Sequence, residues 1–280
     1  MKAVEHNLML TNRIQEKLLL GAFLLSISIC LVACGDDSES SSGPEYVWVD
    51  PSTVTHGTMT DSRDGKTYRT VTIGSQTWMA ENLNFEYNEG TARSYCYDSL
   101  ASNCDKYGRL YFWSAAMDSA ALFSDAGKGC GNYMLCNRKG KIRGICPEGW
   151  HLPNLNEWLE LVYPMASRVY ESVKDGPYGY GEFYGAGIRL KSVDGWMEGS
   201  HQTDDYGFSA LPSGYFLCDY DDGFEHMGRG TQFWSSSELN IYHAFALELD
   251  YRVLEPAASD DALISGNHKT WAYSVRCVKD

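Results

Sequence analysis

Four carboxylates crowd a short stretch of the second half of the chain, at Asp219, Asp221, Asp222 and Glu225. Oxygen ligands on a turn that contains glycine can hold Ca²⁺, which needs six or more of them. The spacing is not that of an EF-hand loop, and acidic turns are also common at solvated hairpin tips. The sequence therefore leaves two interpretations, a Ca²⁺ loop and an acidic hairpin tip, and favours the tip.

Tyrosines are the second group that could bind a ligand, at Tyr178, Tyr180, Tyr184 and Tyr206. Gly and Tyr nearly alternate over Asp175–Tyr184, which predicts a loop with exposed rings. Phenol rings with nearby carboxylates and amides suit stacking on a sugar or contact with a protein surface. Rings on such loops also pack on their own scaffold, so both interpretations stay open.

His151 is the one candidate for a general base that the sequence singles out. No Ser or Cys nucleophile is marked out by a local pattern, and a His at the entry of a core helix is usually a packed structural residue. We therefore predict no catalytic residue, no enzymatic activity and no cofactor other than the Ca²⁺ considered above.

An apolar run over Leu18–Ile29 follows basic residues and precedes Leu-Val-Ala-Cys, which ends at Cys34. The run suits a signal peptide and is short for a membrane span. Leu-Val-Ala-Cys looks like a bacterial lipobox, in which the Cys takes a diacylglycerol and becomes the new N-terminus; an ordinary signal with an incidental Cys is the alternative. We expect a signal peptide over residues 1–33 and lipid on Cys34.

Residues 34–44 are acidic and rich in serine after Cys34, which predicts a disordered tether before one domain over residues 45–280. The tether resembles surface-export signals of Gram-negative lipoproteins, and it could equally be a simple spacer. Removing residues 1–33 takes away three basic and two acidic side chains, so the net charge changes from −14 to −15. Nucleic acid is thereby a poor partner, because phosphate binding needs a basic face. We expect a lipid-anchored protein of the outer membrane, and the surface-export interpretation of the tether adds display at the cell surface.

Besides the lipidated Cys34, seven cysteines remain in the processed chain, and an exported protein usually pairs such cysteines as disulfides. Short spacing suggests the pairs Cys96–Cys104 and Cys130–Cys136, while Cys146–Cys277 would tie the core helix to the last strand. Cys218 is then the odd one, and we expect it to be buried in a strand. No Cys-x-x-Cys pair is present, so a zinc site is not expected.

The element expected to organise the fold is a helix that begins at Leu155. Asn154 and Glu157 have the spacing of a capping box, and Pro164 should kink or split the helix. Its apolar stripe recurs at three- and four-residue steps. The stripe comprises Leu155, Trp158, Leu159, Val162, Ala166, Val169 and Val173.

Strands are predicted around this helix. Asp64-Gly65 suits a tight hairpin turn between two strands, and Ser114 is placed to cap a short helix. Further strands are expected at residues 207–216, 233–238 and 243–249, and a last one at residues 273–278. Plentiful glycine and aromatic residues with few long helical patterns favour a loop-rich α+β domain.

Several segments, in this order, closely resemble the Fibrobacter succinogenes major paralogous domain, a family of exported proteins, often lipoproteins, of unassigned biochemical activity. The resemblance covers residues 56–280, through the segments 61–68, 74–82, 107–113, 146–158, 207–215, 233–238 and 274–280. Gly-Trp-His-Leu-Pro-x-x-x-Glu-Trp and the final Val-Arg-Cys also look like parts of the C-type lectin-like fold that sulfatase-modifying enzymes share. The resemblance implies a looped, twisted antiparallel sheet with one or two main helices, its N- and C-terminal strands together, and a Cys146–Cys277 staple.

Three functions are compatible with these observations. The preferred one is a surface-displayed binding module for a polysaccharide or a partner protein, and the second is a structural envelope lipoprotein without a small ligand. The third is a modifying enzyme on the sulfatase-modifying scaffold. Those enzymes use two closely spaced reactive cysteines near the C-terminus, whereas this chain has only Cys277 there.

Overall fold

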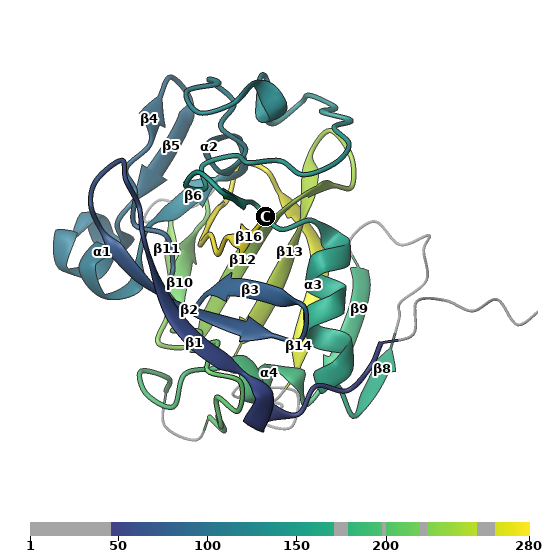
Figure 1. Ribbon diagram of the computed structural model, residues 1–280. Coiled ribbons are helices and arrows are strands. Elements are labelled where there is room, and N and C mark those ends of the chain that lie inside the picture. The colour runs from purple at the N-terminus through teal and green to yellow at the C-terminus, as the bar shows by residue number, and fades with distance from the viewer. Residues whose placement is uncertain (1–45, 171–178, 198–199, 219–222, 251–260) are drawn as a thin grey trace, which may run out of the picture. The chain divides into compact units, whose positions relative to one another are not determined.

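The first of two sheets has the strand order β1-β2-β3-β16-β7, and all its described pairs are antiparallel. The computed structural model describes residues 46–170, 179–197, 200–218, 223–250 and 261–280. The strands are β1 Thr55–Thr60, β2 Thr67–Ile73, β3 Gln76–Met79, β7 Trp150–His151 and β16 Val278–Lys279. The last strand thus lies between β3 and β7, and it does not contact β1 as a neighbour (Figure 1).

The loop between β1 and β2 is longer than the predicted two-residue turn. It spans Asp61–Lys66, and of the Asp64-Gly65 pair only Gly65 has a positive φ, of 74°. The buried Asp61 carboxylate accepts hydrogen bonds from the backbone N–H of Arg63 at 3.0 Å and from its Nε at 2.9 Å. The antiparallel hairpin is confirmed, but its tight turn is wrong, because the side chain of Asp61 organises the loop.

The second sheet has the order β4-β5-β6-β15-β10-β12-β13-β14-β9-β8, with β11 paired to β10. Most pairs are antiparallel, and β10 with β12 is parallel. Its strands are β4 Asn88–Glu89, β5 Ala92–Tyr95, β6 Leu110–Phe112, β8 Arg168–Tyr170, β9 Gly179–Tyr184, β10 Ser213–Phe216, β11 Phe224–Met227, β12 Gly230–Glu238, β13 His243–Asp250, β14 Ala262–His268 and β15 Ala272–Tyr273. The predicted α+β class with largely antiparallel sheet is confirmed.

Helices are few and short: α1 Ala101–Tyr107, α2 Trp113–Ala116, α3 Leu155–Val162 and α4 Ala186–Leu190, with 3₁₀ turns at Pro51–Thr53, Tyr97–Ser99, Asp125–Gly127 and Tyr163–Met165. No helix of the described ranges is long and apolar enough to cross a membrane. Ser114 lies inside α2 and does not cap it, so that prediction is wrong. The helix starts one residue earlier, at Trp113, whose buried indole N–H donates to the carbonyl of Ser235 at 2.9 Å.

The predicted start of α3 is confirmed. Asn154 Oδ1 accepts from the N–H of Glu157 at 3.1 Å, and Glu157 Oε2 accepts from the N–H of Asn154 at 2.9 Å. The helix ends at Val162, because Pro164 has no N–H with which to continue it. The apolar stripe therefore stops there: Val169 lies in strand β8, and Val173 is outside the described residues.

Helix α3 joins the two sheets through aromatic side chains. Trp158 stacks on Trp78 of β3 with ring centroids 4.5 Å apart, and it lies 6.0 Å from the ring of Phe233 in β12. All three rings are fully buried. Large buried rings contribute most of the apolar area of such a core, so α3 is the contact through which the sheets pack on each other.

The predicted last strand at residues 273–278 is wrong in one respect, because it divides between the two sheets. Tyr273 belongs to β15 and Val278 to β16, and Ser274–Cys277, here called the crossing segment, passes from one to the other. On one side, Ser274 exchanges backbone hydrogen bonds with β12, donating to Gln232 at 3.0 Å and accepting from Trp234 at 3.1 Å. On the other side, Val275 and Cys277 accept from the N–H groups of Leu83 at 2.9 Å and Met79 at 3.0 Å.

Arg276 of the crossing segment is fully buried among neutral oxygen atoms. Its Nε donates to Asn82 Oδ1 at 2.8 Å, and its Nη2 donates to the carbonyl of Ser209 at 2.9 Å. Nη1 bonds the carbonyl of Phe208, and the guanidinium lies over the Phe208 ring at 4.4 Å. Burial lowers the pKa of the guanidinium. The five donors of Arg are what this set of oxygen atoms requires.

Three disulfides are present, and they are the expected pairs Cys96–Cys104, Cys130–Cys136 and Cys146–Cys277. The first two close short loops of sequence separation 8 and 6, whereas the third spans a separation of 131. Cys146 precedes β7 and Cys277 precedes β16. Because β7 and β16 pair with each other, the bridge fastens the crossing segment beside this strand pair.

Replacing Cys146 and Cys277 together by Ala should destabilise the protein more than replacing Cys96 and Cys104. The loop-entropy relation gives about 5 kcal/mol for the long loop and about 2.5 kcal/mol for the short one. Urea unfolding of both double variants under non-reducing conditions measures the difference. Equal losses of unfolding free energy would show that the long bridge does not act by restricting the unfolded chain.

Candidate functional site

The tyrosines predicted to bind a ligand do not form a site among the described residues. Tyr206 is fully buried in the core, and its hydroxyl donates to the carbonyl of Val49 at 2.9 Å. Its predicted ligand role is therefore wrong, because a ring packed in the core cannot reach a ligand. No local pattern around Tyr206 indicates this burial, which comes from packing against the distant segment that contains Val49.

The predicted exposed loop is also wrong where it can be checked, since Gly179–Tyr184 is strand β9. Tyr184 is half-buried, its hydroxyl donates to Glu182 Oε2 at 3.0 Å, and the guanidinium of Arg168 lies 3.9 Å from its ring centre. Tyr180 lies in the same strand, but its side chain is not described, and Tyr178 is outside the described residues.

The acidic cluster stays largely untested. Asp219, Asp221 and Asp222 lie outside the described residues, and Glu225 is exposed in strand β11. Within the part of the chain that the structure describes, no three His, Cys, Asp or Glu side chains gather in a way that could hold a metal ion. The Ca²⁺ loop remains a prediction.

Two cysteine predictions have different outcomes. Cys218 is exposed in a turn just after β10 and belongs to none of the three disulfides, so the expectation of a buried strand residue is wrong. The strand ends two residues earlier, at Phe216, because the chain turns there toward β11. Cys34, the predicted lipid site, lies outside the described residues.

His151 is buried between two carboxylates. Its Nδ1 is 2.8 Å from Asp280 Oδ1, and its Nε2 is 2.7 Å from Oε1 of Glu157, the residue that completes the capping box of α3. Carboxylates accept hydrogen bonds, so both contacts form together when both ring nitrogens carry protons. This geometry supports a structural role, since the ring links β7, α3 and the C-terminal residue.

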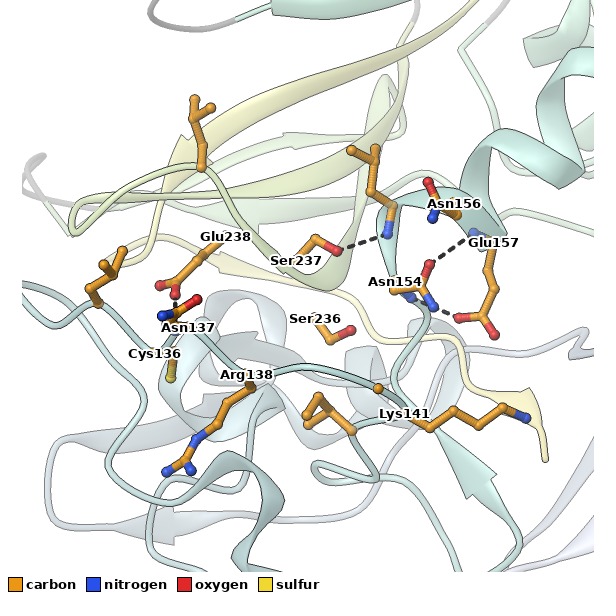
Figure 2. A pocket seen from close by; sticks show the side chains of 15 residues that line it. Cys136, Asn137, Arg138, Lys141, Asn154, Asn156, Glu157, Ser236, Ser237 and Glu238 are labelled. Carbon is orange, nitrogen blue, oxygen red and sulfur yellow. Dashed lines mark hydrogen bonds between the residues drawn. The ribbon is translucent and has the colours of Figure 1, made fainter. Parts of the chain in front are cut away.

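A polar groove of about 590 Å³ opens beside the start of α3, and it is the candidate site (Figure 2). Three segments line it: the loop from Leu135 to Ile142, the first turn of α3 with its cap, and the end of β12 with the following turn. The polar side chains on its walls are Asn137, Arg138, Lys141, Asn154, Asn156, Glu157, Ser236, Ser237 and Glu238.

Hydrogen bonds between α3 and β12 set the distance between two walls of the groove. Ser237 Oγ accepts from the backbone N–H of Leu155 at 3.0 Å, as Figure 2 shows, and the N–H of Ser236 donates to the carbonyl of Pro153 at 2.8 Å. The first helical N–H is thus satisfied by the neighbouring strand. Amide and hydroxyl groups of this wall are held in place before any ligand arrives.

A buried ion pair holds the loop wall, residues 135–142, against the end of β12. Lys269 Nζ lies 2.7 Å from Glu238 Oε2 and donates to the carbonyl of Met134 at 3.0 Å, above the ring of Trp113. Glu238 Oε1 in turn accepts from the N–H of Asn137 at 2.5 Å. Burial raises the pKa of Glu238, but the bonds from Lys269 and from Asn137 outweigh it and leave the pKa below its usual range. The loop from residue 134 to 137 is therefore fastened to the end of β12.

The loop wall is positively charged in an otherwise acidic protein. Arg138, Lys139 and Lys141 are exposed, while the two glutamates that line the groove are already engaged by Lys269 and His151. Sequence reasoning missed this wall. The signal was available as three cations within four residues of a chain whose net charge is −14.

Two exposed rings lie on the segments that continue two walls of the groove, Tyr133 shortly before Leu135 and Tyr242 shortly after Leu239. Tyr133 and Tyr242 are 70% and 44% exposed, and their rings meet edge to face with centroids 5.4 Å apart. The N–H of Tyr133 donates to the carbonyl of Ile241 at 2.9 Å, and the Cys130–Cys136 disulfide closes the loop that carries Tyr133.

Glu157 should make the stability of the protein depend on pH. Burial raises the pKa of Glu157, but the hydrogen bonds from His151 and from the N–H of Asn154 outweigh it, so the pKa lies below its ordinary value of 4.5. A lowered folded-state pKa contributes stability above the unfolded-state value, and this contribution is lost as the pH falls through the folded-state value.

Glu157→Gln keeps the size of the side chain and a capping oxygen but removes the charge. We expect it to lower the free energy of unfolding by about 1–2 kcal/mol at pH 7, and the difference from the parent to shrink below pH 4. Urea unfolding from pH 3 to 7 measures this. Glu148→Gln, in an exposed turn, is the control, and a pH-independent loss for Glu157→Gln would contradict the charge argument.

Comparison with known proteins gives one match. The family model of the Fibrobacter succinogenes major domain (Fib_succ_major) matches residues 71–279, which include both sheets' central strands and the residues of the groove. No curated protein and no solved structure matches the chain. The C-type lectin-like fold therefore stays a prediction. The match extends over most of the sequence, and the chain belongs to the Fibrobacter succinogenes major domain family.

Proposed function

We propose that this protein is an exported, lipid-anchored binding module of the outer membrane that holds a polysaccharide in the groove beside α3. The observation that carries the proposal is a groove of about 590 Å³ with polar, prearranged walls. A pair of exposed tyrosine rings lies on the segments that continue two of these walls, Tyr133 shortly before Leu135 and Tyr242 shortly after Leu239. The anchor at Cys34 and display at the cell surface are parts of the proposal that rest on the sequence.

The lining has the chemistry that a sugar chain requires. Asn156, Ser236 and Asn137 present amide and hydroxyl groups, which can exchange hydrogen bonds with sugar hydroxyls. Tyr133 and Tyr242 offer large apolar ring area at a low cost in side-chain entropy. Polar walls fix the orientation of a ligand, and the rings supply contact area.

The charge of the loop wall points to acidic sugars. Arg138 and Lys141 line the groove, and the two carboxylates there are paired within the protein. A uronate residue would meet two cations without an opposing free carboxylate. Arg138 and Lys141 are exposed, so their attraction to such a ligand should weaken as salt rises.

We propose binding without chemical conversion of the ligand, on a scaffold of the C-type lectin-like type. The buried His151 is occupied by two carboxylates, and Cys277, the cysteine nearest the C-terminus, is in a disulfide. These contacts support structural roles for the two residues that a catalytic mechanism would have used.

Affinity electrophoresis of the full chain in detergent tests the proposal. We expect retardation in gels that contain polygalacturonate, less in a neutral mannan, and a loss of at least five-fold in affinity for Tyr133→Ala. Tyr170→Ala is the matched control, because Tyr170 is also exposed, at 59%, and lies in β8, which contributes no residue to the groove, whereas Tyr133 belongs to the loop that continues into the groove wall.

Three outcomes are informative. Retardation of the parent and the control but not of Tyr133→Ala supports the groove. Equal retardation of all three proteins places binding elsewhere, and no retardation in any polysaccharide contradicts the function. Retardation that disappears with a chelator would move the site to the acidic residues 219–225.

A further inference from the structure

A pair of histidines lies at one end of the second sheet, apart from the residues that line the groove. His243 begins β13 and His268 ends β14, and the two are direct partners in the antiparallel ladder. Their rings are tilted by 52° with centroids 4.3 Å apart, and Nε2 of one is 3.4 Å from Nε2 of the other. His243 is buried and His268 is half-buried.

The turn before β13 determines which nitrogen of His243 carries the proton. Asn240 Oδ1 accepts from the backbone N–H groups of Tyr242 at 2.8 Å and His243 at 2.9 Å, which identifies that atom as the oxygen. The same oxygen is 3.1 Å from Nδ1 of His243. An oxygen can only accept, so Nδ1 is the donor, and in the neutral ring Nε2 carries the lone pair.

The lone pair of His243 Nε2 therefore faces Nε2 of His268 across 3.4 Å. That distance is long for a hydrogen bond, which usually spans about 2.7–3.2 Å. Two ligand nitrogens that share one ion are about 3.0 Å apart when they lie at right angles, as on Ni²⁺ or Cu²⁺, and about 3.4 Å apart in a tetrahedral site, as on Zn²⁺, when each metal–nitrogen distance is about 2.1 Å. The observed separation lies at the upper end of this range. Asn240 supplies the second contact that a metal-binding His requires, because it fixes the tautomer and the ring orientation.

The surroundings of His243 disfavour its cationic form. Burial lowers the pKa of His243, and the neighbouring His268 and Lys269 lower it further. The Lys269 ammonium is itself paired with Glu238. Neutral imidazole is the form that binds a metal ion.

We propose that His243 and His268 form a two-imidazole site for a divalent transition-metal ion of the Ni²⁺, Cu²⁺ and Zn²⁺ class. No third His, Cys, Asp or Glu side chain completes the set among the described residues, so water or a donor from a bound ligand fills the remaining positions. Imidazole ligands favour these ions over Ca²⁺ and Mg²⁺, which take oxygen ligands.

Equilibrium dialysis of the full chain in detergent against Ni²⁺ tests the site, since thiols do not reduce this ion. We expect the parent to bind one more Ni²⁺ than His268→Gln, or to bind it at least ten-fold more tightly. His201→Gln, in which an exposed histidine outside the pair is replaced, should match the parent. In imidazole ¹H–¹⁵N spectra, paramagnetic Ni²⁺ should first broaden the signals of His243 and His268.

Asn240→Ala keeps both histidine ligands but removes the acceptor that fixes the tautomer of His243. It should therefore weaken Ni²⁺ binding less than His268→Gln does. Thermal unfolding without metal checks that each variant is folded. The proposal is overturned if the parent and a folded His268→Gln bind Ni²⁺ with the same stoichiometry and affinity. It is also overturned if Ni²⁺ broadens other imidazoles before these two.

Discussion

The structure depends on a charged side chain that is held entirely by neutral oxygen atoms. Arg276 lies where the two sheets meet, and it donates to Asn82 and to the carbonyl of Ser209 while lying on the ring of Phe208. A buried guanidinium is costly unless its donors are satisfied, so these acceptors must all be in place together. The segments that follow β3 and precede β10 are thereby fixed relative to the crossing segment.

The groove follows from this arrangement. Once β16 lies between β3 and β7, the chain after Trp150 and His151 enters α3 at a defined point, and the capping box starts the helix beside the end of β12. The loop wall is fastened to the end of β12 by Lys269, which comes from the turn just before β15. Two walls therefore trace to α3 and β12, and the loop wall is fastened to them through Glu238, which bonds both Lys269 and the N–H of Asn137.

Local patterns in the sequence predicted those features of the fold that depend on residues close together in the chain. The capping box of Asn154 and Glu157 involves neighbours along the chain, and the short cysteine pairs close small loops. Positions set by distant contacts were not predictable in this way. Tyr206 looks like any loop tyrosine until Val49 supplies its acceptor. The division of residues 273–278 between two sheets depends on partners far earlier in the chain, and the basic wall of the groove has no motif beyond its composition.

The pairing of β3 with β16 has a consequence for the time at which the fold can form. Trp78 pairs with Val278, so two neighbouring strands are about two hundred residues apart in the sequence. At about 5–20 residues per second, a ribosome needs on the order of 10–40 s to make the stretch between them. During that interval β3 has no partner on one side, and Trp78 lacks its final packing. The first sheet cannot be completed before the last strand has been made, and this delay is compatible with the export that we propose.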